Sequence, residues 1–178
     1  MIGYKKNYYT IDDIKAEMVL LEQERKKIND KRKIWNNSSQ EFVFNFFEKL
    51  SVEFNNKLKI QEINNFKNLS SVIVGLNDFK SGIFERRDTG LVEFTYFSGS
   101  LGYSQTLNGN INVWIAPPFV EGLMEAQPVK NIDSLHPANI TINKLTGHLH
   151  KFIEVVLEWE AQENIIGKLG YTQITEEN

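Results

Sequence analysis

The sequence predicts a mixed α+β fold, and the prediction rests on three patterns. Apolar residues recur every three or four positions near both ends of the chain, over residues 11–58 and 142–166, which is the spacing of a helix face. Between them, over residues 71–115, β-branched and aromatic residues alternate with polar ones. Turn residues interrupt that middle region at short intervals. We therefore expect two N-terminal helices, an antiparallel meander sheet of about four or five strands, and a long C-terminal helix packed on the sheet.

The composition limits the class of protein. The chain has 178 residues, of which 41% are hydrophobic and 24% charged, and we expect a single domain over residues 1–178. It has no cysteine, which excludes disulfides, thiolate metal sites and cysteine nucleophiles. The net charge of -3 argues against nucleic-acid binding. No stretch reaches the roughly 18 to 20 apolar residues of a membrane span, and no signal peptide is recognisable. We expect a cytoplasmic protein that uses no cofactor.

The first helix is expected over residues 10–36. Thr10 can cap it, and Asp12 and Asp13 lie in its first turn, where the helix dipole favours negative charge. Positions in three-four steps then form a coiled-coil-like seam, of which six are apolar: Ile11, Ile14, Met18, Leu21, Arg25, Ile28, Arg32 and Trp35. Such a helix either lies along the body with its charged end protruding or pairs with another helix. Packing within the chain is the favoured alternative, and self-association as a dimer is the other.

A second helix is expected after a break at residues 36–38. Ser38 and Glu41 have the spacing of a capping box, which starts a helix. The apolar stripe over residues 43–58 is rich in phenylalanine, and such stripes are far more often buried core than lipid or ligand sites. Residues 59–69 fit either a continued helix or a short strand.

Turn residues predict the register of the sheet. Strands are expected over residues 71–76, 83–87, 91–97, 101–107 and 110–115. Residues 88–90 and 98–100 are interpreted as three-residue hairpin loops, and Asn108-Gly109 as a two-residue type I′ turn. With these turns one face of the sheet carries the core residues, which are Val92, Phe94, Tyr96, Gly102, Ser104, Thr106, Ile111, Val113 and Ile115.

The opposite face of this sheet is the candidate binding surface. Its expected facing pairs are Tyr103 with Trp114, Gln105 with Asn112, and Glu85 with Glu93. Aromatic, amide and paired carboxylate side chains on one open face are typical of a binding surface. Two alternatives need no function: a solvated face with cross-strand pairs, or a second core under the phenylalanine-rich helix.

Few residues suggest catalysis. A close Glu85–Glu93 pair would raise the pKa of one carboxyl, which is the arrangement of an acid and base in a hydrolase or lyase. His148 and His150 stand two apart in a helical stretch, so they point about 200° apart and cannot share a metal. His150 and Glu154 are expected to form an exposed pair. Phosphate-loop, dinucleotide, nucleophile-elbow and zinc-protease motifs are absent from the sequence, which favours a non-enzymatic protein without a metal site.

The C-terminal helix is expected to begin near Thr141 and to stop at Gly167 and Gly170, before a frayed tail over residues 172–178. The segment 133–137 is interpreted as a turn leading into it.

The leading functional hypothesis is a non-enzymatic module that binds another protein, as an inhibitor, immunity protein, adaptor or chaperone would. The first alternative is a small-molecule or nucleotide binder that uses the outer sheet face. The second is the hydrolase or lyase with the Glu85–Glu93 pair.

Overall fold

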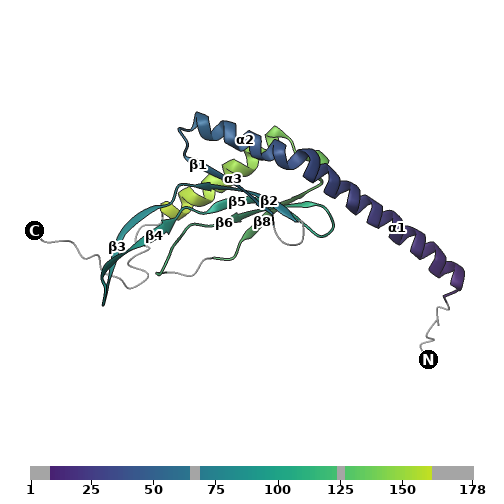
Figure 1. The fold of residues 1–178 in the computed structure, drawn as a ribbon, viewed down its shortest axis with the longest axis horizontal. Coiled ribbons are helices and arrows are strands. Elements are labelled where there is room, and N and C mark those ends of the chain that lie inside the picture. Colours follow the sequence, from purple (N-terminus) through teal and green to yellow (C-terminus); the bar gives the residue numbers. More distant parts are fainter. Residues whose placement is uncertain (1–8, 65–68, 124–126, 162–178) are drawn as a thin grey trace, which may run out of the picture.

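A computed structural model of the chain describes residues 9–64, 69–123 and 127–161, and it has the expected α+β class (Figure 1). Its helical elements are α1 (Ile11–Ile34), the π-helical turn η1 (Trp35–Ser39), α2 (Gln40–Glu53), the 3-10 turn η2 (Pro137–Asn139) and α3 (Ile142–Glu160). Its strands are β1 (Leu58–Asn64), β2 (Ser70–Leu76), β3 (Phe79–Arg87), β4 (Gly90–Phe97), β5 (Ser100–Gln105), β6 (Ile111–Ala116), β7 (Phe119–Val120) and β8 (Lys130–Leu135). Within the described ranges these strands form a five-stranded sheet, in the order β1-β2-β5-β6-β8, and a three-stranded sheet, in the order β3-β4-β7; every pairing is antiparallel.

The first helix begins as expected and continues past its expected end. Thr10 and Asp13 form a capping box, since the Thr10 hydroxyl accepts from the Asp13 amide at 3.2 Å and the Asp13 carboxylate accepts from the Thr10 amide at 2.8 Å. The expected break at residues 36–38 is absent. The capping box expected at Ser38 is wrong too, because its hydroxyl donates to the Ile34 carbonyl, one turn back in the helix, at 2.9 Å.

The π-helical turn η1 takes the place of the expected break. A π turn accommodates an irregular stretch without opening the helical hydrogen-bond ladder. Its buried residues hold it to the body: the Trp35 indole N–H donates to the Ser70 hydroxyl at 2.7 Å, and the Ser39 hydroxyl donates to the Pro137 carbonyl at 3.1 Å. The chain therefore runs from α1 into α2 as one rod.

One face of the five-stranded sheet is covered by η1, α2 and α3, which lie on the same side of it (Figure 1). The core between these layers is built from Trp35, Val43, Phe47, Leu58, Val72, Val74, Leu101, Tyr103, Ile111, Val113, Ile115, Leu135, Ile140, Leu145, Leu149, Phe152 and Val156. A smaller cluster joins the end of α3 to the three-stranded sheet through Phe94, Tyr96, Val120 and Trp159. The other face of the five-stranded sheet, called the outer face below, carries Ser71, Ile73, Gly102, Ser104, Asn112 and Trp114.

The expected meander is interrupted between β4 and β5. Residues 98–100 do not form a hairpin, because β4 pairs with β3 and β7 whereas β5 pairs with β2 and β6. Gly99 has φ +79°, and a Cβ there would lie 2.6 Å from the Ala116 carbonyl oxygen. Only glycine fits this crossing point. The expected shared face of Val92 with Gly102 and their neighbours is therefore wrong.

The β5–β6 hairpin differs from the expected register by one residue. Its loop has three residues, since the Thr106 amide donates to the Asn110 carbonyl at 2.9 Å and the Gly109 amide to the Thr106 carbonyl at 3.0 Å. Gly109 has φ +81°, while Asn108 is not among the residues with positive φ. A type I′ turn requires positive φ at both positions, so the loop is instead of the three-residue kind that ends in a left-handed glycine. Tyr103 consequently faces Val113, not Trp114.

The strands β1 and β8 and the helix α3 differ in how well the sequence predicted them. The ambiguous segment after α2 is the strand β1, and the turn expected over 133–137 is largely the strand β8. The helix α3 begins at its expected cap, where the Thr141 hydroxyl accepts from the Lys144 amide at 3.4 Å. Gly167, Gly170 and the tail over 172–178 lie outside the described residues.

Candidate functional site

Tyr103, expected on an open surface, lies in the core. Its side chain is fully buried, and its hydroxyl lies 3.2 Å from Nδ1 of His148, whose Nε2 lies 3.3 Å from a carboxylate oxygen of Asp133. A neutral imidazole with its proton on Nε2 satisfies both contacts, donating to the carboxylate and accepting from the tyrosine. The two partners come from β5 and β8, while the histidine comes from α3.

Burial dominates the protonation of two members of this triad (Tyr103, His148 and Asp133), since Tyr103 and His148 are buried while Asp133 is partly exposed. It lowers the pKa of His148 below its ordinary value, and the hydrogen bond and charge of Asp133 oppose that shift. Burial also raises the pKa of the Tyr103 hydroxyl, with a further contribution from the Asp133 charge. The tyrosine and the histidine are therefore neutral near pH 7. Because the tyrosine is fully buried, a substrate in solvent cannot reach its hydroxyl. The hydrogen bonds of the triad instead connect the sheet to α3.

Gln105 also faces the helices, as the one-residue register shift requires. It is buried opposite Ile111, and neither atom of its amide has a hydrogen-bond partner among the described residues. The expected Gln105–Asn112 pair is not formed, because Asn112 lies on the outer face opposite Ser104.

Trp114 does lie on the outer face, and it covers β5. A Cβ at Gly102 would lie 2.1 Å from the indole ring, so only glycine allows the ring to lie flat on the strand. The indole N–H donates to the Ser104 hydroxyl at 2.8 Å, and the Ser71 hydroxyl donates to the same oxygen at 2.9 Å. These contacts hold the half-buried ring in one orientation across three strands.

The two expected carboxylates lie apart. Arg87 pairs with Gly90 across a two-residue turn at Asp88 and Thr89, not the expected three-residue loop. Glu85 therefore faces Val92, while Glu93 faces Phe84. Neighbouring residues of a strand point to opposite faces, so Glu85 and Glu93 lie on opposite sides of the hairpin.

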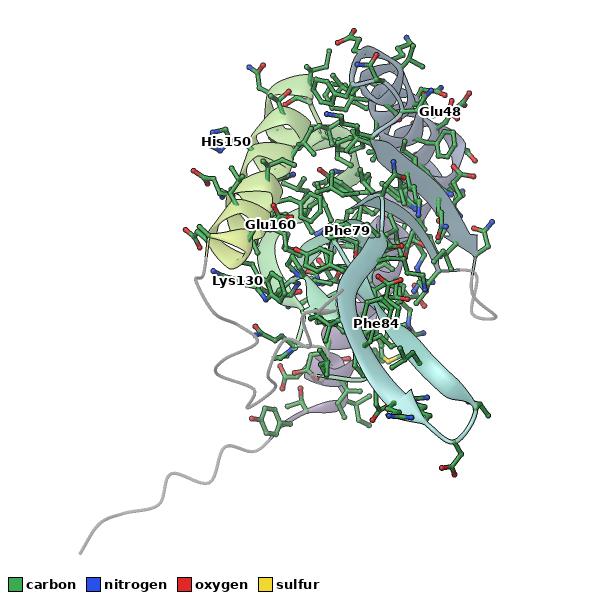
Figure 2. The ribbon with its side chains drawn as sticks, turned by 90° about the vertical axis from the view of Figure 1, so that its left-hand side faces the viewer. Glu48, Phe79, Phe84, Lys130, His150 and Glu160 are labelled. Atoms are coloured by element: carbon green, nitrogen blue, oxygen red, sulfur yellow. The ribbon has the colours of Figure 1, made fainter. Side chains whose placement is uncertain are left out.

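Each of these carboxylates has its own partner. Glu85 forms an ion pair with Arg87, and Glu93 accepts from the Gly82 amide at 3.0 Å. The close pair needed for acid and base catalysis is not formed, and that basis for a hydrolase or lyase is removed. Phe79 and Phe84 lie along the same hairpin in Figure 2, and both are about half exposed.

The histidines of α3 point in different directions, as their spacing predicts. His148 is buried, whereas His150 points away from the sheets (Figure 2) and pairs with Glu154 at 3.4 Å, as expected for an exposed pair. Among the residues that the structure describes, no group of three histidine, aspartate or glutamate side chains could hold a metal.

A groove of about 230 Å³ lies at the junction of the two sheets, at one end of the outer face. Its lining includes the small residues Gly75, Gly99, Ser100 and Ala116. Phe97 and Phe119 also line it, stacked with ring centroids 4.9 Å apart. The pattern of small residues opposite a stacked aromatic pair was not visible in the sequence, because these residues come from five strands and one connection.

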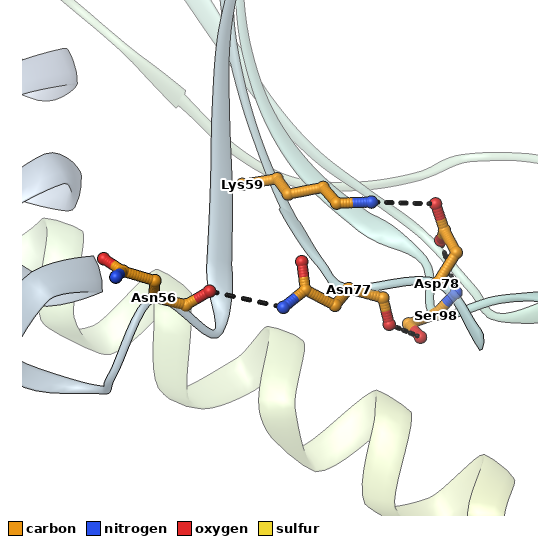
Figure 3. Close-up of polar contacts among 5 residues, drawn as sticks. All are labelled: Asn56, Lys59, Asn77, Asp78 and Ser98. Carbon is orange, nitrogen blue, oxygen red and sulfur yellow. Dashed lines mark hydrogen bonds and ion pairs between the residues drawn. The ribbon is translucent and has the colours of Figure 1, made fainter.

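A set of polar contacts holds this junction together (Figure 3). Lys59 of β1 pairs with Asp78 at 3.4 Å, and a carboxylate oxygen of Asp78 accepts from the Ser98 amide at 3.3 Å. The Ser98 hydroxyl donates to the Asn77 carbonyl at 2.9 Å, and the Asn77 amide donates to the Asn56 carbonyl at 3.2 Å. Three connections of the chain are thereby joined at this end of the groove.

The helix α1 is the most exposed element of the described chain. None of its residues is buried, and it extends away from the sheets in Figure 1. The seam of α1 is therefore not packed against the described part of the chain, contrary to the favoured expectation, and the helix does not lie along the body. Among the described residues, its side-chain hydrogen bonds to the body come from its base: Lys31 donates to the Asn110 side chain at 2.9 Å, and Arg32 donates to the Leu107 carbonyl at 2.7 Å.

Comparisons with known proteins do not assign this chain to a family or a function. Neither the family models, nor the curated proteins, nor the solved structures contain a match to this chain. None of the described helices is both long enough and apolar enough to span a membrane. Any proposal about function therefore depends on the surfaces described above.

Proposed function

We propose that this protein is a non-enzymatic protein-binding module and that α1 is its binding element. The observation that supports this proposal is a helix of 24 residues that buries none of them against the part of the chain that the structure describes. Its exposed apolar residues, with 42% to 73% of their area open to solvent, are Ile11, Ile14, Met18, Val19, Leu20 and Leu21. Apolar surface collected on one element in this way marks interaction sites in soluble proteins.

The helix is also organised in advance for binding. An isolated helix of this length has limited stability in water, but α1 has a capping box at its free end and hydrogen bonds from Lys31 and Arg32 at its base. It continues through η1 into the packed helix α2. A partner therefore meets a formed helix, which reduces the entropy lost on binding. Recognition through an exposed helix face is a common mode of protein binding.

The groove between the sheets gives weaker support to small-molecule binding. Its volume of about 230 Å³ is below the roughly 300 to 1,000 Å³ of typical ligand sites. The buried positions of Tyr103 and Gln105 also remove two of the side chains on which that alternative depended. Protein binding through α1 is therefore the better supported function.

Photo-crosslinking in the cells that naturally make the protein tests the proposal. A benzophenone amino acid replaces Leu21 on α1, and in a matched control it replaces Leu157 on the exposed side of α3. We expect a discrete crosslinked product for position 21 and none for position 157, with mass spectrometry identifying the captured chain. If position 21 gives no more product than position 157, α1 is not the binding element.

A further inference from the structure

The charges of α1 are divided between its two halves. Residues 11–22 contain four carboxylates and one lysine, a net charge of -3, whereas residues 23–34 contain six basic and two acidic side chains, a net charge of +4. Two copies of this helix lying side by side in the same direction would place like charges together. Lying in opposite directions, they would place each acidic half against a basic half, which is favourable.

The seam of α1 is compatible with that antiparallel arrangement. When the two-fold axis passes between Val19 and Leu20, each of the six seam positions from Ile11 to Ile28 meets a seam position of the second copy. The facing pairs are Ile11 with Ile28, Ile14 with Arg25, and Met18 with Leu21. Four of these six side chains are more than 40% exposed in the single chain, namely Ile11, Ile14, Met18 and Leu21.

This register also accounts for the arginine in the seam. Arg25 faces Ile14 of the second copy, and Asp13 and Glu17 flank that residue in the acidic half. A long arginine side chain covers apolar surface with its stem and extends its charged head to the edge of a helix pair. An arginine at this position therefore pairs with carboxylates in the antiparallel dimer, whereas in a parallel dimer it meets its own copy.

The body of the protein sets the extent of the overlap. From Ile11 to Ile28 the helix spans about 26 Å; residues 11–27 are all exposed, and contacts with the β5–β6 loop begin at Ile28. A Cβ at Gly109 would lie 2.9 Å from the Ile28 carbonyl oxygen, and Leu107 in the same loop is 71% exposed. The pairing of Ile11 with Ile28 therefore ends where the β5–β6 loop first contacts the helix.

We propose that α1 binds α1 of a second copy of this chain as an antiparallel helix pair centred between Val19 and Leu20. The inference rests on the proposed function, because it names the partner that the α1 surface binds.

Two neighbouring substitutions test the seam on the full-length chain. Leu21→Glu places a charge in the seam, and Leu20→Glu places the same charge about 100° further round the helix, outside the seam. Sedimentation equilibrium should show a dimer for the wild-type chain and for Leu20→Glu, and a dissociation constant at least tenfold higher for Leu21→Glu. A wild-type monomer at all concentrations, or equal weakening by both substitutions, overturns the proposal.

The direction of the pair is tested by spin labels, which the absence of cysteine makes simple. Single cysteines replace Ala16, Gln23 or Asp30, three positions on the same outward side. In the antiparallel pair the axial separation of the two labels is about 10 Å for the first two sites and about 31 Å for the third. A parallel pair gives the same distance at all three sites and overturns the proposal.

Salt provides a second check on direction. The Debye length falls from about 10 Å at 0.1 M to about 3 Å at 1 M salt, so screening should weaken an antiparallel pair. A parallel pair, in which like charges meet, should become tighter. Tightening at 1 M salt contradicts the antiparallel arrangement.

The two proposals fail in different ways. If position 21 crosslinks a different protein while the purified chain is monomeric, the helix is a binding element and the second copy is not its partner. If neither self-association nor any crosslink at position 21 is found, both proposals are overturned.

Discussion

The helices α1 and α3 have similar N-terminal caps and similar apolar spacing, but α1 is exposed and α3 is packed on the sheets. Both have a threonine N-cap, Thr10 or Thr141, and both carry apolar residues in three-four steps. Yet α3 buries Leu145, His148, Leu149, Phe152, Val156 and Trp159 against the sheets, while α1 buries no residue. The spacing therefore predicts that a helix forms and which side is apolar, but it does not predict what covers that side.

The residues between the apolar positions explain the difference. In α3 the seam is continuous from Leu145 to Trp159, and Ile153 lies half-buried beside it. In α1 the seam contains Arg25 and Arg32, and burying such charges under a sheet without partners would be costly. Long amphipathic side chains suit a helix pair open to water at its edges. The charged residues that interrupt a seam thus help to predict whether the helix is buried under a sheet, as its apolar residues predict which side is apolar.

The largest expected effect that tests this comparison is the loss of a core side chain. Phe152→Ala in α3 removes a ring that is fully buried and should lower the free energy of unfolding by about 3 to 5 kcal/mol. Leu20→Ala in α1 changes a side chain that is 59% exposed and should shift it by less than about 0.5 kcal/mol. Urea unfolding followed by circular dichroism measures both. A loss above 2 kcal/mol for Leu20→Ala would mean that α1 packs on the body.

A smaller effect comes from the two helix caps. Thr141→Ala should lower the free energy of unfolding by about 1 kcal/mol, because α3 unfolds together with the core. Thr10→Ala should leave it unchanged and only speed amide hydrogen exchange in the first turn of α1. Both are measured in a Leu21→Glu background, which removes self-association. Equal losses of stability would show that α1 unfolds with the body.

The smallest expected effect is a pH dependence carried by α3. The pKa of His148 is lowered in the folded chain, so below about pH 6.5 the unfolded chain takes up the proton first. The contribution to stability is therefore complete above that pH and is lost as the pH falls toward the folded value. Asp133, Tyr103, Lys144 and Lys151 are the groups around this histidine.

Urea unfolding at pH 7.5 and pH 5.5 measures that dependence. The loss of stability on acidification should be smaller in His148→Gln than in the wild-type chain, and unchanged in the matched control His150→Gln. The same loss in all three proteins would assign the pH dependence to other groups. α1 has no histidine, so an effect from that helix is not expected.

The sequence predicted the strands well and their loop lengths poorly. The loop expected to have three residues, after Arg87, has two, and the loop expected to have two, at Asn108-Gly109, has three. Both kinds of hairpin place a glycine with positive φ at or next to the turn, so residue types alone do not separate them. A one-residue error exchanges the two faces of a strand.

The one-residue register error in the β5–β6 hairpin explains which candidate site residues were predicted on the correct face. The face of β6 was assigned correctly, so Trp114 and Asn112 lie on the outer face and Val113 lies in the core. On β5 the shift moved Tyr103 and Gln105 inward. The contact of Tyr103 with His148 could not be predicted, because it joins a strand to a helix 45 residues away.

The continuity of α1, η1 and α2 gives the molecule a mechanical property. A loop at residues 36–38 would let the projecting helix swing independently of the sheets. The π-helical turn instead transmits its orientation to Trp35, whose indole bonds to β2. The helix α1, about 36 Å long, is therefore attached to the core in a fixed direction, so a partner that binds its N-terminal end also sets the orientation of the sheets.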